Sequence, residues 1–438
     1  MLVRAAYRYR CLENTLKENM KIIKYPKQSE YKAILTRPMQ DISVIEERVL
    51  PILKKVKVEG DSAIREYALQ FDNVFLDALS VPESDVQNAE NLLSDDLKIA
   101  IKQAYANICK FHEAQKSVPE KIETMDGVTC WRKSVAIDKV GLYVPGGTAP
   151  LFSTVLMLGI PAKIAGCREV ILCTPSTHPA IYYAAQLCGI SKIFRVGGSQ
   201  AIAAMAYGTE SIPQVYKIFG PGNQYVMAAK MLVNKEGLAI DMPAGPSEVA
   251  VYADGTANPV FVAADLLSQA EHGIDSQVLL VSTSEKIIDA VNQELNKQVS
   301  VLPRAEFASK ALENSQAVLV ESQEIALEML NEYAAEHLIM SIENAEAVSE
   351  KIYNAGSIFL GNYTPESAGD YASGTNHTLP TNGYAKAYSG VSLDSFMKKI
   401  TVQNITQEGI KNIGKTIIEM ATAESLEAHA NAVKVRLL

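Results

Sequence analysis

The stretch VGLYVPGGTAPLFSTVLMLGIPAKIAG, residues 140–166, determines the fold class predicted for this chain. VGLYV is a short run typical of a β-strand, PGGTAP is a turn, and residues 154–166 have the composition of an apolar helix. The same order then repeats, with strands predicted at 169–175 and 192–198 and helices at 179–190 and 199–208. Short strands that alternate with helices predict βαβ units around a parallel sheet.

A second series of the same kind begins with SEVAVYA at 247–253. Further strands are predicted at 276–283 and 317–322, and helices at 261–273, 284–299 and 324–338. Upstream of both series, apolar residues at helical spacing over 83–117 predict a mainly helical region. Beyond about 380 the residues become a polar connection followed by a last helix at 422–433.

We therefore expect an α/β fold with two similar units, although no clear sequence identity relates them. The expected segments are an extension of unassigned function at 1–19, a mainly helical N-terminal region at 20–138, a first α/β domain at 139–246, a second at 247–380 and a C-terminal tail at 381–438.

Composition excludes several classes of protein. The chain has 438 residues, of which 48% are hydrophobic and 21% charged, as in ordinary globular proteins of roughly two to four domains. Its net charge is −9 and it has no long basic run, which argues against nucleic acid or an anionic membrane as a partner.

The cysteines and the apolar runs predict a cytoplasmic protein. The apolar run at 155–166 is broken by glycine, proline and lysine, well short of the roughly 18 residues of a membrane span. The 6 cysteines show no CxxC spacing, which favours free thiols in a reducing compartment. Residues 1–19 contain arginines but no continuous apolar core, so a secretory signal is not expected, and Met20 offers a second possible start.

Four glycine-bearing turns lie where ligands bind in parallel sheets. They are VPGGTAP at 144–150, VGGSQ at 196–200, FGPGNQY at 219–225 and PAGPSE at 243–248. We expect them at the carboxyl ends of strands, where backbone can approach a phosphate. None is a GxGxxG fingerprint, so by themselves they indicate tight turns and no particular ligand.

Gln269 and His272 are three residues apart in FVAADLLSQAEHGIDSQV, 261–278, which we interpret as a helix that stops at Gly273. On one helical face they offer a carbonyl oxygen and a ring nitrogen to a metal. The alternative is a histidine cation at a helix C-terminus, where the helix dipole favours positive charge. Two residues cannot complete a metal site, so this interpretation requires partners elsewhere.

Glu336 and His337 lie at the end of the predicted helix 324–338. Adjacent helical positions diverge by about 100°, so they are not expected to pair, but both could rim one pocket as two proton acceptors. A solvated helix end is the alternative.

Further candidates lie near the C-terminus. Asp370, a hard oxygen ligand, and His377 lie in ESAGDYASGTNHTLPT, 366–381, which has the composition of a loop and could be a plain surface turn. Glu424 and His429 are five residues apart in the last predicted helix, which could equally be a solvated terminal helix. His112 and His178 are in polar surroundings and suggest no function.

From about residue 20 to 438, the chain resembles the histidinol dehydrogenase family. The resemblance rests on eight motifs in order: VGLYVPGG, VGGSQAIAAMAYGTE, FGPGNQYV, GPSEV, DLLSQAEHG, AAEHL, GDYASGTNHTLPT and YSGVSLDSFMKKITVQ. Its one departure is the extension before Met20, which leaves the start of the chain open.

The resemblance implies two incomplete Rossmann-like domains and a homodimer in which the C-terminal tail contributes to the partner's site. It implies the last step of histidine biosynthesis, the NAD-linked four-electron oxidation of L-histidinol to L-histidine, with one zinc per subunit. The implied zinc ligands are Gln269, His272, Asp370 and His429 of the partner subunit. The implied substrate contacts are Ser247, Gln269, His272, Glu336, His337, Asp370, His377, Glu424 and His429, and the implied NAD contacts are Tyr143, Gln200 and Asn223.

We hypothesise that His337 takes the alcohol proton and that Glu336 activates a water for the oxidation of the aldehyde. A rival mechanism would use a thiohemiacetal on Cys130, Cys167 or Cys173, although their apolar or strand contexts favour buried thiols. A zinc hydrolase that uses Glu336 without NAD and a non-catalytic two-domain binding protein are the other classes considered.

Overall fold

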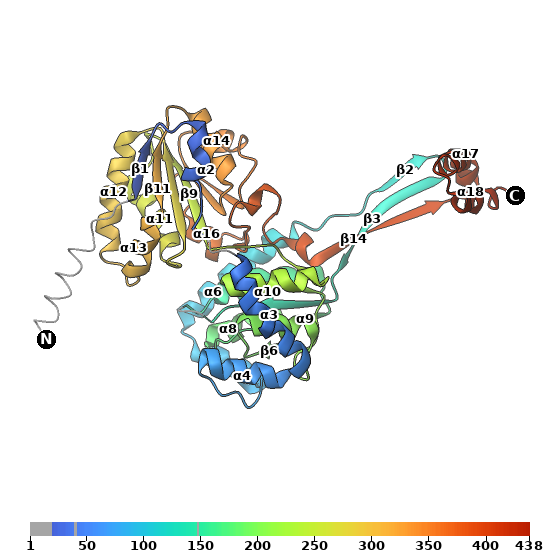
Figure 1. Ribbon diagram of the computed structural model, residues 1–438, viewed down its shortest axis with the longest axis horizontal. Coiled ribbons are helices and arrows are strands. Elements are labelled where there is room, and N and C mark those ends of the chain that lie inside the picture. The colour runs from blue at the N-terminus through green and yellow to red at the C-terminus, as the bar shows by residue number, and fades with distance from the viewer. Residues whose placement is uncertain (1–19, 39–41, 147–148) are drawn as a thin grey trace, which may run out of the picture.

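Residues 140–166 form strand β4 (Lys139–Tyr143) and helix α7 (Phe152–Ala165) in the computed structural model, which describes residues 20–38, 42–146 and 149–438 (Figure 1). β4 is hydrogen-bonded to a parallel strand on each side, and Val140 and Leu142 are fully buried. Gly166 follows α7 with a φ of 84°, a left-handed conformation that glycine adopts without strain.

The first sheet is parallel, and its strand order in the described chain is β6-β5-β4-β7-β8. Helices α5 to α8 cover one face, and α3, α4, α9 and α10 cover the other. The predicted βαβ units of this part are therefore confirmed. Besides β4 and α7, the lobe contains α3 (Ile42–Glu59), α4 (Asp61–Asp72), α5 (Glu83–Asn88), η2 (Ala89–Leu92), α6 (Asp95–Glu113), β5 (Glu169–Cys173), α8 (Pro179–Cys188), β6 (Lys192–Phe194), α9 (Gly198–Tyr207), β7 (Lys217–Phe219), α10 (Gln224–Lys235) and β8 (Ala239–Ile240).

The second sheet is also parallel, with the order β1-β11-β10-β9-β12-β13 over the residues the structure describes. Helices α11, α12 and α13 pack on one face, and α2, α14 and α15 pack on the other. Its elements are β1 (Lys21–Lys24), η1 (Gln28–Glu30), α2 (Tyr31–Ile34), β9 (Glu248–Ala253), α11 (Pro259–Ala270), β10 (Gln277–Ser282), α12 (Glu285–Val299), α13 (Ala305–Glu313), β11 (Gln316–Leu319), α14 (Gln323–Tyr333), β12 (His337–Ser341), α15 (Ala345–Ser349), β13 (Ser357–Leu360) and α16 (Glu366–Tyr371).

The segment 20–138 serves three parts of the molecule. β1 pairs with β11 at the edge of the second sheet, whereas α3 packs on α9 and α10 of the first lobe. Strands β2 (Lys121–Met125) and β3 (Val128–Ala136) belong to neither lobe. The segment is mainly helical, as expected, but it also contributes these strands.

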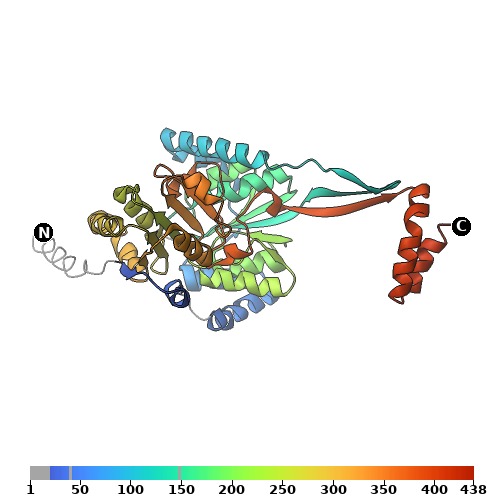
Figure 2. The ribbon, with the colours of Figure 1, turned by 90° about the horizontal axis from the view of Figure 1, so that it is seen from above.

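A long antiparallel arm leads from the lobes to the C-terminus (Figures 1 and 2). β3 is its middle strand, between β2 and β14 (Met397–Ile405). Helices α17 (Gln407–Ala423) and α18 (Glu427–Lys434) pack against each other at the tip, far from both lobes (Figure 2). The short helices η3 (Tyr384–Lys386) and η4 (Leu393–Phe396) precede β14.

Several helix predictions were wrong at their ends. The helix predicted at 324–338 stops at Tyr333, because Ala334 adopts a left-handed conformation with a φ of 52°, and His337 starts β12. The helix expected to stop at Gly273 ends at Ala270. The last predicted helix is divided at Ser425, whose φ is 61°, between α17 and α18.

The expectations about membrane spans and free cysteines can be compared with the structure only over the described residues. Within the described ranges, no helix combines the length and the apolar character needed to cross a membrane. The cysteines in those ranges are free, while Cys11 and the rest of the 1–19 extension lie outside them.

Candidate active site

Glu336 and His337 lie at the amino end of β12, the strand between β9 and β13. Their exposed fractions are 6% and 4%, so the alternative of a solvated helix end is wrong. Their side chains do approach each other, with 3.8 Å between Glu336 Oε2 and His337 Nδ1, contrary to the helical interpretation. The change from helix to strand at this point brings the two groups together.

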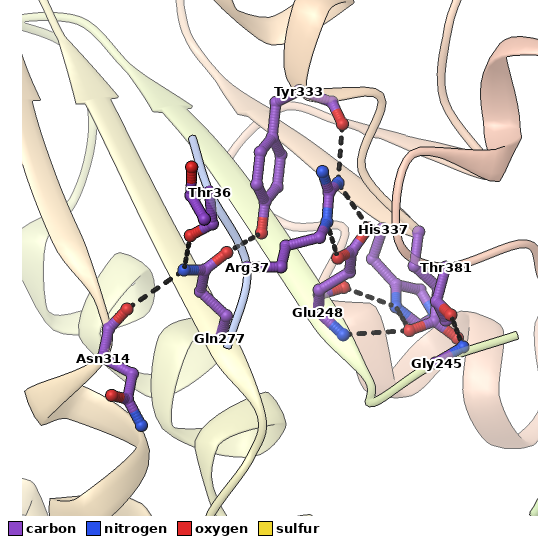
Figure 3. Close-up of polar contacts among 10 residues, drawn as sticks. Thr36, Arg37, Gly245, Glu248, Gln277, Asn314, Tyr333, His337 and Thr381 are labelled. Carbon is purple, nitrogen blue, oxygen red and sulfur yellow. Dashed lines mark hydrogen bonds and ion pairs between the residues drawn. The ribbon is translucent and has the colours of Figure 1, made fainter. Parts of the chain in front are cut away.

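Glu248, the first residue of β9, contacts both groups through its backbone, and Figure 3 shows its approach to His337. Its N–H donates to Glu336 Oε2 at 3.0 Å, and its carbonyl oxygen lies 3.4 Å from His337 Nδ1. The acid–base pair therefore lies at the amino ends of β9 and β12. The turn at 243–248 follows β8 of the first sheet, as expected, but it also leads into this end of β9. The acid–base pair therefore does not lie at the carboxyl ends of the strands of the second sheet, where a ligand site was expected.

Burial and neighbouring carboxylates shift the pKa values of this pair. Burial raises the pKa of Glu336 to about 8. Burial alone would lower the pKa of His337, but Glu336, Glu366 and Asp370 favour its charged form and raise that pKa to about 10. A divalent cation bound among these carboxylates would oppose their effect and favour the neutral imidazole that a general base requires.

A group of metal donors lies beside the pair. His272, Glu366 and Asp370 each offer a ligand atom, and these atoms lie within 4.8 Å of one another. Asp370 Oδ1 is 3.5 Å from His337 Nε2, and the pKa of Asp370, which burial would raise, is lowered by its contact with His337. Asp370 lies in the short helix α16, so the prediction of a loop at this residue was wrong.

Gln269 supplies the observation that tests whether a metal fits. It lies in the last turn of α11 with 1% exposure, and neither of its side-chain oxygen and nitrogen atoms has a hydrogen-bond partner among the described residues. A buried unpaired amide is costly unless a ligand satisfies it. With an imidazole and carboxylates nearby, the donor set suits zinc or another divalent metal that accepts nitrogen and oxygen ligands.

His377 joins the two lobes at the site. Its Nδ1 is 2.9 Å from the Asp370 carbonyl oxygen, and its Nε2 is 3.0 Å from Thr154 Oγ1 on α7. Burial lowers the pKa of His377, so the neutral ring can donate from Nδ1 to Asp370 and accept from Thr154. Asn376, one residue earlier, donates to the Met157 carbonyl at 2.6 Å.

The structure does not bring Glu424 and His429 to this cluster. Glu424 caps the end of α17 and His429 lies in α18, both exposed at the tip of the arm (Figures 1 and 2). Ser247 precedes β9, next to Glu248, and is half-buried.

A cavity of about 950 Å³ in the first lobe contains the three predicted cofactor contacts in its lining, Tyr143, Gln200 and Asn223. It opens at the carboxyl ends of β4 and β6, beside the N-termini of α9 and α10. The Tyr143 hydroxyl accepts from the Gly198 N–H at 3.0 Å, and burial raises the pKa of Tyr143 to about 12. The Asn223 side chain caps α10 by accepting from two backbone N–H groups. The volume of the cavity and the helix N-termini beside it suit a nucleotide.

Sequence reasoning missed Arg37, Glu248 and Glu366 near the site and placed His112 in the wrong surroundings. Arg37 and Glu248 form a pair whose members are 211 positions apart, so no local pattern could reveal it. Glu366 and Asp370 are four apart, a spacing that would have indicated one face of α16 had that helix been predicted. His112, expected in polar surroundings, is fully buried, with Nδ1 2.9 Å from the Ile108 carbonyl and Nε2 3.4 Å from Asn376.

In the described part of the chain, the three cysteines considered as nucleophiles lie on elements other than those of the acid–base pair. Cys130 lies on β3 in the arm. Burial raises the pKa of Cys167 to about 12 and also raises that of the fully buried Cys173, which disfavours the reactive thiolate.

The fold and site define a two-lobed α/β enzyme that combines a buried acid–base pair, nitrogen and oxygen donors for a metal, and a nucleotide-sized cavity. The family model described as histidinol dehydrogenase matches residues 35–437, and the chain belongs to this family of oxidoreductases.

Three known proteins illustrate the similarity. Histidinol dehydrogenase of Bacteroides thetaiotaomicron is 62% identical over 95% of this chain and 99% of its own length. The enzyme of Vibrio parahaemolyticus is 51% identical over 94% of this chain and 96% of its own. The crystal structure of histidinol dehydrogenase from Elizabethkingia anophelis superposes with a TM-score of 0.93, at 53% identity, over 96% of this chain and 98% of that one.

Proposed function

We propose that this protein oxidises L-histidinol to L-histidine through L-histidinaldehyde, the last step of histidine biosynthesis, in the cytoplasm. The observation that carries the proposal is the buried pair of proton acceptors, Glu336 and His337, 3.8 Å apart beside a set of metal donors. Family membership supplies the substrate, because the relatives above are named for it.

We assign zinc to Gln269, His272 and Asp370, with His429 of the partner subunit as the fourth ligand. The assignment is supported by the unpaired amide of Gln269 and by the approach of the His272 and Asp370 ligand atoms. When bound, zinc supplies a Lewis acid and a template for the imidazole and amine of the substrate, without changing its own oxidation state. Ser247 and His377 are assigned as further substrate contacts.

Two oxidations require two hydride acceptors, and NAD is the acceptor assigned to the cavity of Tyr143, Gln200 and Asn223. In the first oxidation His337 accepts the hydroxyl proton while the carbinol carbon loses a hydride, which gives the aldehyde. In the second, Glu336 removes a proton from a water whose oxygen bonds to the aldehyde carbon, and the hydrate loses a second hydride and becomes the carboxylate. One water is consumed, and the protons leave through these two residues.

We also propose a homodimer with exchanged arms. Glu424 and His429 are exposed at the tip of an arm that extends away from its own lobes (Figure 2). In a two-fold symmetric pair, each arm can reach the lobes of the other subunit and complete that site.

The first test measures NADH formed per L-histidinol consumed by zinc-loaded protein, with and without a chelator. We expect about two per substrate, because the alcohol and the aldehyde each lose one hydride, and we expect loss with chelation and recovery with zinc. One NADH per substrate would mean that the aldehyde is released and that the role of Glu336 is wrong. Turnover without NADH would favour a hydrolase, and binding without turnover would favour a binding protein.

A further inference from the structure

Arg37 lies close to the acid–base pair but contacts neither member of it. It follows α2 on the N-terminal segment, and its side chain is 14% exposed. Nη2 donates to Glu248 Oε1 at 2.8 Å while Nε donates to Glu248 Oε2, an arrangement in which the guanidinium grips both carboxylate oxygens. Glu248 is 3% exposed in its side chain, so this pair is shielded from solvent.

The same guanidinium binds the end of α14 (Figure 3). Nη2 donates to the Tyr333 carbonyl at 2.6 Å, one of the carbonyls that a helix C-terminus leaves without an intrahelical partner. The guanidinium carbon lies 4.0 Å from the centre of the Tyr333 ring. The Tyr333 hydroxyl in turn donates to Gln277 Oε1 at 2.9 Å, and Gln277 Nε2 donates to the Thr36 carbonyl at 3.1 Å, next to Arg37.

These contacts lie on both sides of Glu336. On one side, Glu248 donates its N–H to the Glu336 carboxylate at 3.0 Å. On the other, Tyr333 ends α14 three residues before Glu336, and the left-handed Ala334 follows at once. The Arg37 side chain thus connects β9, whose Glu248 N–H binds the Glu336 carboxylate, to α14, the helix that precedes Glu336 in the chain.

We propose that Arg37 is a positioning residue that holds the Glu336 carboxylate for water activation by fixing Glu248 and the end of α14. The inference rests on the proposed function, in which Glu336 activates the water. His337 lies 3.4 Å from the Glu248 carbonyl oxygen, a longer approach than the 3.0 Å bond of Glu248 to Glu336, so oxidation of the aldehyde should depend on Arg37 more than oxidation of the alcohol.

A double-mutant cycle tests the inference. Arg37→Lys keeps the charge but cannot grip both Glu248 oxygens and the Tyr333 carbonyl together. With supplied histidinaldehyde, we expect a roughly 10- to 100-fold fall in kcat. Losses of this size are typical when a residue that orients a catalytic group is changed or when that group is displaced. In the Glu336→Gln background, where the residual rate of aldehyde oxidation is already low, Arg37→Lys should lower that rate almost no further, because both substitutions impair the same activation of water. An equal fold loss in both backgrounds would show that Arg37 acts on general stability and would overturn the proposal.

Two further variants separate charge from folding. The double variant Arg37→Met with Glu248→Gln removes both buried charges together. If the paired hydrogen bonds of Arg37 to Glu248 position Glu336, this variant should show the same loss of aldehyde oxidation as Arg37→Lys. Full aldehyde turnover in this variant would contradict the proposal. Arg168 is the matched control, because it forms an exposed ion pair with Asp138 at 3.0 Å on the first lobe. Arg168→Met should retain both oxidations.

Amide hydrogen exchange keeps the inference testable apart from the activity. If the wild-type chain forms no NADH from L-histidinol, the proposed function fails. The Glu248 N–H should still exchange roughly tenfold faster in Arg37→Lys than in wild type, because its bond to Glu336 is loosened. Unchanged exchange at Glu248 would overturn the positioning role whatever the activity.

Discussion

Asp265 is a buried carboxyl of α11 that no sequence pattern singled out. Burial raises its pKa to about 7, and a hydrogen bond with the Glu366 backbone only partly offsets this effect. A carboxyl whose pKa is higher in the folded chain contributes stability below the unfolded pKa, and that contribution is lost as the pH rises from about 4 to about 7. Asp265→Asn keeps the neutral form at every pH. We expect it to raise the unfolding free energy at about pH 8 by on the order of 1–3 kcal/mol and to change it little at about pH 4.

Urea unfolding of chelator-treated protein at both pH values measures this difference. Asp138→Asn is the control, since Asp138 is exposed in its pair with Arg168 and should not alter the pH dependence. If Asp265→Asn lost stability between the two pH values as steeply as wild type, the carboxyl would not be the group that titrates.

At the scale of elements, the amino ends of β12 and β13 meet at Gly356. The Gly356 N–H donates to the Ala335 carbonyl at 2.8 Å, and the Ser357 N–H donates to the Glu336 carbonyl at 2.9 Å. A Cβ added at Gly356 would lie 2.5 Å from the Glu336 carbonyl oxygen, too close for any side chain. We therefore expect Gly356→Ala to displace Glu336, lower kcat and destabilise the fold by about 1–3 kcal/mol, as overpacking does.

Steady-state kinetics and thermal unfolding together check this expectation. Gly255→Ala is a matched control in the same lobe, because a Cβ there meets no atom within 4 Å. Wild-type kinetics and stability in Gly356→Ala would mean that the strand ends can separate without affecting the site.

Elements also show what the sequence could and could not predict. The strands and helices within 140–208 and 247–322, apart from α13, were predictable because their apolar residues follow local periodicity. KIIK at 21–24 was not, because its pairing with β11 is set by residues almost 300 positions away. Ala334 breaks α14 without a glycine or proline, so the change to strand at His337 left no local signal. The motifs named the candidate residues, but the contacts among them arise from tertiary packing.

On the scale of the whole molecule, the arm separates residues that the proposed chemistry requires together. Glu424 and His429 are exposed at its tip, whereas Glu336 is buried in the second lobe (Figure 1). If arms are exchanged, every site combines the lobes of one subunit with the arm of the other. A chain with a substitution in its lobes and a chain with a substitution in its arm should then restore activity to each other in a mixed dimer.

Co-expression of Glu336→Gln chains with His429→Ala chains tests this arrangement. In the mixed dimer, one site receives both defects and the other receives neither, because the intact lobes of the His429→Ala chain meet the intact arm of the Glu336→Gln chain. Random pairing makes half of the dimers mixed, so we expect about a quarter of wild-type activity on histidinaldehyde, although each variant alone is nearly inactive. A mixture no more active than its parents would show that each arm serves its own lobes, which would require a large movement of the arm from the position in Figure 2.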